Sequence, residues 1–109
     1  VIRRGANTSM ALAIKSIRNQ SNAMVSAGNT GALMAFSKLF LKTISGINRP
    51  AIAACFPTKQ GEVCMLDLGA NIECDANNLV QFAVMGEIFA RIVLGLKNPS
   101  VGLLNVGSE

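Results

Sequence analysis

The stretch AMVSAGNTGALMAF, residues 23–36, decides how this chain is read. A short apolar run comes first, a turn with two glycines follows, and an apolar helix-like run begins at Leu33. Gly28 and Gly31 lack a Cβ, so the turn can be tight and a ligand can approach its backbone. Because a helix begins with unpaired N–H groups and the positive end of its dipole, the turn suits an anion such as phosphate. Glycine turns of this kind also occur for purely structural reasons.

Apolar periodicity on both sides of this turn predicts an alternation of helices and strands. The expected helices cover about residues 10–20, 30–43 and 78–97, and the expected strands cover 23–25, 51–56, 63–68 and 101–106. Polar residues 57–62 join the second and third strands as a hairpin, so that pair is antiparallel. The order α-β-α-β-β-α-β therefore predicts an α/β protein, a three-layer α/β/α sandwich with a mixed sheet.

Length and composition set outer bounds. The 109 residues make one domain or part of one, and half of them are apolar. The chain begins with Val1 and carries no secretion signal. Its last predicted strand is followed by a turn and by no further predicted element. We therefore expect an internal segment of a larger cytoplasmic protein, truncated at both ends. The net charge is +4, but the basic residues are scattered and Trp and Tyr are absent. This pattern argues against nucleic acid as a partner and favours solvated helix faces.

Cysteine and histidine usage limits the chemistry. Cys55, Cys64 and Cys74 show no C-x-x-C spacing, and the first two fall in predicted strands, where buried reduced thiols are the expectation. Cys74 follows a glycine loop, a position that allows an exposed thiol. The chain has no histidine, so it supplies neither a Ser-His-Asp triad nor histidine metal ligands, and we expect no metal.

Three predicted strand ends carry small and amide-bearing residues, and they are the candidate binding site. If the strands are parallel, these ends share the sheet edge at which α/β proteins bind ligands. The Asn and Thr side chains can donate hydrogen bonds to phosphate or carbonyl oxygens, whereas Asp67 can either serve the site or cap its own turn. Ordinary turn formation is the alternative for each. No nucleotide-binding glycine motif is present, and no cofactor is expected. The candidates are Ser26, Gly28, Asn29, Thr30, Gly31, Asp67, Gly69, Asn71, Asn105 and Gly107.

Several of these motifs resemble one family. SAGNTGALM at 26–34 closely resembles the glycine turn of the bacterial phosphate acyltransferases known as PlsX. Further segments resemble the family in the same order, and together they look like its central third: NTSM at 7–10, RPA at 49–51, LDLGAN at 66–71, LVQFAVMG at 79–86 and VGLLNVG at 101–107. Two positions depart from it, because Gly5-Ala6 replaces more basic residues and Asn78 stands where a histidine is common.

The resemblance implies an enzyme of phospholipid synthesis. Such an acyltransferase moves a fatty acyl group from acyl carrier protein to inorganic phosphate, giving acyl phosphate. It also implies a fold of the isocitrate dehydrogenase and phosphotransacylase type, a homodimer, and a cytoplasmic location with peripheral membrane contact. Alternatives are a coenzyme A-dependent phosphotransacylase and a non-catalytic acyl-carrier or membrane-surface scaffold. The catalytic candidates are Asn29, Thr30 and Asn71, and the carrier-binding candidates are Arg3, Arg4 and Lys59.

Overall fold

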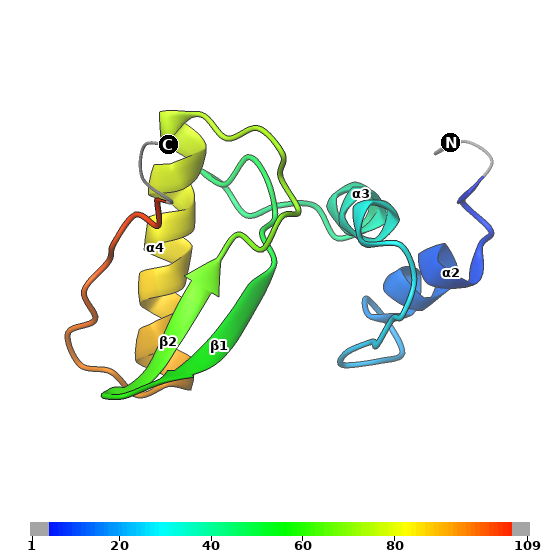
Figure 1. The fold of residues 1–109 in the computed structure, drawn as a ribbon. Coiled ribbons are helices and arrows are strands. Elements are labelled where there is room, and N and C mark those ends of the chain that lie inside the picture. Colours follow the sequence, from blue (N-terminus) through cyan, green and yellow to red (C-terminus); the bar gives the residue numbers. More distant parts are fainter. Residues whose placement is uncertain (1–4, 106–109) are drawn as a thin grey trace. The chain divides into compact units, whose positions relative to one another are not determined.

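A computed structural model describes residues 5–105 (Figure 1). The chain divides into two compact units, residues 1–50 and 51–109, which are described separately. The described part of the first unit holds helices α2 (Ser9–Ser16) and α3 (Thr30–Phe40). The described part of the second holds strands β1 (Ala53–Thr58) and β2 (Gly61–Leu66) and helix α4 (Ala76–Val93).

The first unit is built on one small apolar cluster between α2 and α3. Ala11 and Ile14 of α2 are fully buried, and Phe36 of α3 is 6% exposed. Met10, Leu33 and other partly buried apolar side chains pack around them. The helices expected at about 10–20 and 30–43 are thus confirmed in their central parts. Thr8 begins α2, because its hydroxyl accepts a hydrogen bond from the Ala11 N–H at 3.4 Å.

Both helices of the first unit are shorter than their apolar patterns predict. Helix α2 ends at Ser16, and residues 17–20 continue as turns. Helix α3 ends at Phe40 rather than near residue 43, because Lys42 has a φ of 65°. A residue with positive φ cannot continue a right-handed helix, so α3 stops before residue 43.

The second unit contains the predicted hairpin. β1 and β2 pair in antiparallel register, from Ala53 opposite Leu66 to Thr58 opposite Gly61. The turn is therefore only residues 59–60, shorter than the predicted 57–62, and Pro57 lies within a strand. The Thr58 hydroxyl fastens this turn by donating to the Gly61 carbonyl at 3.0 Å.

Helix α4 packs against β2 and supplies the buried side chains of the second unit. Phe82 and Ala90 are buried on this helix. Asp75 caps it, and the helix ends at Val93 rather than near residue 97, because Gly95 has a φ of 67°. An ion pair lies on its surface, with Arg91 and Glu87 joined at 2.8 Å.

Two predicted strands are wrong as far as the structure describes them. Residues 23–25 belong to no strand, and Val25 is 99% exposed. Residues 101–105 are exposed and belong to no strand, and 106 lies outside the described residues. A strand needs a neighbour for its backbone hydrogen bonds, and within residues 5–105 the sheet has two strands, β1 and β2. The α/β class is confirmed, whereas the mixed three-layer sandwich is not seen in this part of the chain.

Candidate functional site

The glycine turn at 26–31 leads directly into α3. Asn29 is the N-cap of this helix: its Oδ1 accepts from the Ala32 N–H at 3.0 Å, and its carbonyl accepts from the Leu33 N–H at 3.0 Å. Ser26 organises the start of the turn, because its Oγ accepts from the Gly28 N–H at 3.1 Å. Residues 27–31 are all exposed. The turn is therefore shaped by its own neutral side chains and is open to solvent.

The helix start leaves donors that the cap does not use. Thr30 and Gly31 are the first two residues of α3, and first-turn N–H groups have no acceptor within a helix. Asn29 Oδ1 engages the N–H of Ala32 and not these two. Two backbone donors beside the positive end of the helix dipole can thus face an anion.

Gly28 lies close to a side chain of α2. A Cβ at this position would lie 2.5 Å from the Met10 Cε, at the far end of a flexible side chain of α2. At Gly31 a Cβ would lie 3.4 Å from Asn29 Oδ1, at the near limit of ordinary contact. The turn therefore lies against the Met10 side chain, which can move to make room for a larger residue at position 28.

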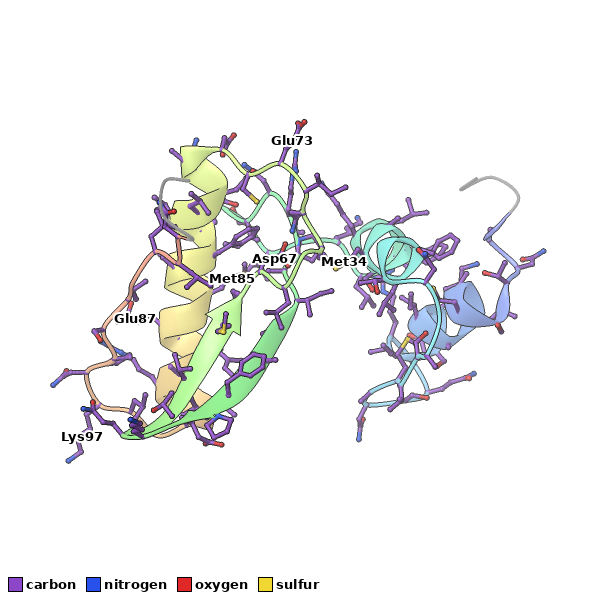
Figure 2. The ribbon with its side chains drawn as sticks, viewed as in Figure 1. Met34, Asp67, Glu73, Met85, Glu87 and Lys97 are labelled. Atoms are coloured by element: carbon purple, nitrogen blue, oxygen red, sulfur yellow. The ribbon has the colours of Figure 1, made fainter. Side chains whose placement is uncertain are left out.

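The second candidate turn follows β2 and is organised by one carboxylate, Asp67, labelled in Figure 2. Asp67 Oδ1 accepts from the Ile52 N–H at 2.9 Å. Its Oδ2 accepts from the Asn71 N–H at 2.6 Å and from the Asn71 Nδ2 at 3.0 Å. The peptide bond between Leu66 and Asp67 is cis, and Gly69 has a φ of 76°, which glycine adopts without strain. Asp67 thus ties the residue before β1 to the loop after β2.

The surroundings keep Asp67 ionised. Burial acts to raise the pKa of this carboxyl group, but hydrogen bonds from the Ile52 and Asn71 N–H groups, the Asn71 side chain and the Ala70 N–H outweigh it. The net effect lowers the pKa of Asp67 below its ordinary value. An ionised carboxylate accepts hydrogen bonds and repels phosphate, so Asp67 suits the shaping of its turn better than contact with an anion.

The remaining predicted residues are dispersed. Asn105 is exposed outside the helices and strands, and Lys59 lies exposed in the hairpin turn. Arg3, Arg4 and Gly107 lie outside the described residues. The glycine turn belongs to the first unit and the Asp67 turn to the second, so a shared edge of these turns stays a prediction.

The cysteines differ from their predictions. Cys55 is exposed and Cys64 is half-buried, so the expectation of buried strand thiols is wrong for the first and met in part by the second. Cys74 is half-buried rather than exposed, and its Sγ lies 3.8 Å from the Asn71 carbonyl oxygen as a hydrogen-bond donor. No group of three potential metal-ligating side chains occurs among residues 5–105.

Two structural roles went unnoticed in the sequence. The contact from Ile52 to Asp67 spans 15 positions, and no local pattern signals it. Asn78 completes a capping box with Asp75: the Asp75 carboxylate accepts from the Asn78 N–H at 2.7 Å, and Asn78 Oδ1 accepts from the Asp75 N–H at 3.4 Å. The spacing D-x-x-N before an apolar run was the available signal. Asn78 is 5% exposed and thus belongs to the helix start rather than to an open site.

The described part of the chain has no helix that combines the length and the apolar character needed to cross a membrane. Its helices and hairpin instead make it an α/β protein, with glycine and asparagine turns at the helix starts.

Comparison with known proteins places the chain in one family. Residues 1–109 match the model of the family described as fatty acid synthesis protein, and the chain belongs to that family. It is 61% identical over 110 residues to the phosphate acyltransferase of Paramagnetospirillum magneticum and 65% identical over 109 residues to that of Rhodospirillum centenum. It is also 56% identical over 109 residues to the phosphate acyltransferase of Rhodospirillum rubrum. These alignments cover 99–100% of this chain and 31% of each relative. The resemblance to phosphate acyltransferases is confirmed, and the chain spans about a third of their length.

Proposed function

We propose that the full-length protein transfers a fatty acyl group from the thioester of acyl carrier protein to inorganic phosphate, giving acyl phosphate for phospholipid synthesis. The observation that carries this proposal is the alignment of the whole chain with relatives named phosphate acyltransferase. Residues 1–109 would serve as an internal segment of one α/β/α domain with a mixed sheet. We expect no turnover from this segment alone, because it spans 31% of those relatives.

The proposed reaction does not require a general acid or base among residues 1–109. Inorganic phosphate is already a nucleophile at neutral pH, so its oxygen can attack the thioester carbon without a histidine base. The carbon–sulfur bond then breaks and the carrier thiol leaves. The protein must hold phosphate near the carbon and stabilise the oxyanion that develops there.

The glycine turn is our choice for the phosphate or oxyanion contact. Its support is the pair of first-turn N–H groups at Thr30 and Gly31 and the exposure of residues 27–31. Asn29 sets the direction of those donors by capping α3 through Ala32. In this assignment the N–H groups of Thr30 and Gly31, with the Asn29 and Thr30 side chains, contact the anion, and Ser26 and Gly28 shape the turn.

Asp67 takes a positioning role in this proposal. Its carboxylate already accepts from Ile52 and from Asn71, and its charge would oppose bound phosphate. It would hold Asn71 and Gly69 at the edge of the site, which Asn105 and Gly107 would complete. Asn71 is then the residue of this turn that approaches the acyl or phosphate oxygens.

Partners and location follow from the same proposal. Lys59, exposed at the hairpin turn, would meet the acidic carrier protein together with Arg3 and Arg4. We further propose a homodimer that acts in the cytoplasm and touches the membrane surface peripherally.

The test is an assay of thiol release by the full-length protein. Long-chain acyl carrier protein is supplied with and without inorganic phosphate, and acyl-coenzyme A is supplied in a parallel series. We expect release from the carrier thioester only when phosphate is present. Faster phosphate-dependent release from acyl-coenzyme A would support a coenzyme A-dependent phosphotransacylase instead. No phosphate-dependent release from either substrate would support a non-catalytic scaffold and overturn the proposal.

A further inference from the structure

Two thiols face each other across the hairpin. Cys55 of β1 and Cys64 of β2 are direct register partners. Pro57 has no N–H and is paired with Glu62, so their pair is of the non-hydrogen-bonded kind. Because the two kinds alternate along an antiparallel ladder, the cysteine pair two positions away is of the same kind.

This position brings the two side chains as close as a sheet allows. Partners in a non-hydrogen-bonded pair have Cα atoms about 4.5 Å apart, the closer of the two cross-strand spacings. Disulfides span Cα separations of about 4.4–6.8 Å, so a bridge fits without separating the strands. Both thiols are free.

The two thiols differ in their surroundings. Burial raises the pKa of the Cys64 thiol, and the neighbouring Cys55 adds to this through its charge and a hydrogen bond. Cys55 is exposed and Cys64 is half-buried, so an oxidant from solvent meets Cys55 first. Cys74 lies off the hairpin and donates to the Asn71 carbonyl instead.

We propose that Cys55 and Cys64 form a dithiol site that hydroperoxides oxidise to a cross-strand disulfide. The Cys55 thiolate attacks a peroxide oxygen, the O–O bond breaks, and Cys55 becomes a sulfenic acid. The sulfur of Cys64 then attacks the Cys55 sulfur and loses its proton, the S–O bond breaks, and water leaves. With hydrogen peroxide, both peroxide oxygens and both thiol hydrogens end in water. The site is independent of acyl transfer.

The disulfide can be mapped by tryptic digestion, because Lys59 lies between Cys55 and Cys64 in the sequence. The folded full-length protein is treated with hydrogen peroxide, free thiols are alkylated, and the protein is digested with trypsin without reduction. Cleavage after Lys59 leaves Cys55 in peptide 43–59 and Cys64 in peptide 60–91, which also carries Cys74. We expect these peptides to be joined, with fragmentation placing the link on Cys55 and Cys64 and with two fewer alkylated thiols.

Single variants separate the partners. Cys74→Ser is the matched control and should keep the joined peptides, whereas Cys55→Ser and Cys64→Ser should lose them. Fragmentation of the joined wild-type peptides assigns the link even where a variant fails to fold. Separately alkylated Cys55 and Cys64 after peroxide treatment of the folded protein would overturn the proposal, as would a link from Cys55 to Cys74.

Discussion

The turn at 26–31 and the turn at 67–71 both contain glycine and asparagine. They differ in whether a carboxylate of the protein accepts hydrogen bonds from the backbone N–H groups of the turn. In the first, the neutral Asn29 engages the Ala32 N–H, and the helix start keeps first-turn donors at Thr30 and Gly31. In the second, the ionised Asp67 is already surrounded by donors from Ile52 and Asn71. Glycine and asparagine after an apolar run therefore do not by themselves mark an anion site. What matters is whether a carboxylate of the protein already occupies the donors.

The largest expected effect is a loss of stability when the turn at 67–71 is disrupted. Asp67→Ala removes the acceptor of the Ile52 and Asn71 N–H groups, and the loss should lower the free energy of unfolding by about 2–3 kcal/mol. Urea denaturation of the full-length protein measures this. Glu62→Ala is the matched control, an exposed carboxylate on the same hairpin, and should change stability by less than about 0.5 kcal/mol. Equal stability of Asp67→Ala and Glu62→Ala would contradict the role of Asp67.

The pH dependence of stability sharpens the same point. Because the pKa of Asp67 is lowered in the folded state, its contribution is fully present above its unfolded pKa, about 3.9, and is lost as pH falls through the folded value. Wild-type stability should therefore fall more steeply than that of Asp67→Asn below about pH 4. Parallel acid-side slopes in urea titrations at several pH values would contradict this account.

A smaller effect compares two helix caps. Asn29→Ala and Asp75→Ala each remove the side-chain acceptor at the start of a helix, and each should cost about 1 kcal/mol of stability. Only Asn29→Ala should also raise the KM for phosphate of the full-length enzyme, because only its cap orients the proposed anion donors. Thermal unfolding and phosphate titrations check the two halves. A raised KM in both variants would assign the effect to helix stability rather than to the turn.

The smallest expected effect lies outside both turns. Lys59→Glu should raise the KM for acyl carrier protein about threefold at low salt, with little change at high salt, because exposed charges act mainly through screened attraction. Lys97→Glu, also exposed, is the control and should leave this KM unchanged. Steady-state kinetics at two salt concentrations decide between them. Equal increases of this KM in Lys59→Glu and Lys97→Glu would mean that the carrier protein responds to the net charge of the enzyme and not to Lys59.

The sequence predicts local structure well where a pattern and a cap coincide. Asp75 and Asn77 were both possible caps for the apolar run at 78–97, and Asp75 is the cap of α4; alternating short runs around a polar turn place the hairpin. Helix ends were predicted too late, because Lys42 and Gly95 reverse φ within the apolar pattern. The strand predicted at residues 23–25 does not form, because a strand needs a neighbouring strand to pair with. An apolar run in the sequence does not show whether such a neighbour is present.

The sequence predicted which residues make up the candidate site. It did not predict which of their polar groups are already hydrogen-bonded within the protein. The amides and glycines were found from their place after apolar runs. The hydrogen bond from Ile52 to Asp67 joins residues far apart in sequence, and it decides that the Asp67 carboxylate is occupied. Only the fold of the hairpin brings these two groups together.

The most direct test of the glycine turn is the KM for phosphate of full-length Asn29→Asp. Aspartate keeps the cap to Ala32 and suits a helix start, so the variant should be as stable as the wild type. Its negative charge beside the proposed anion should raise the KM for phosphate about tenfold or more, equivalent to about 1.4 kcal/mol. A KM for phosphate equal to that of the wild type would contradict the assignment of this turn.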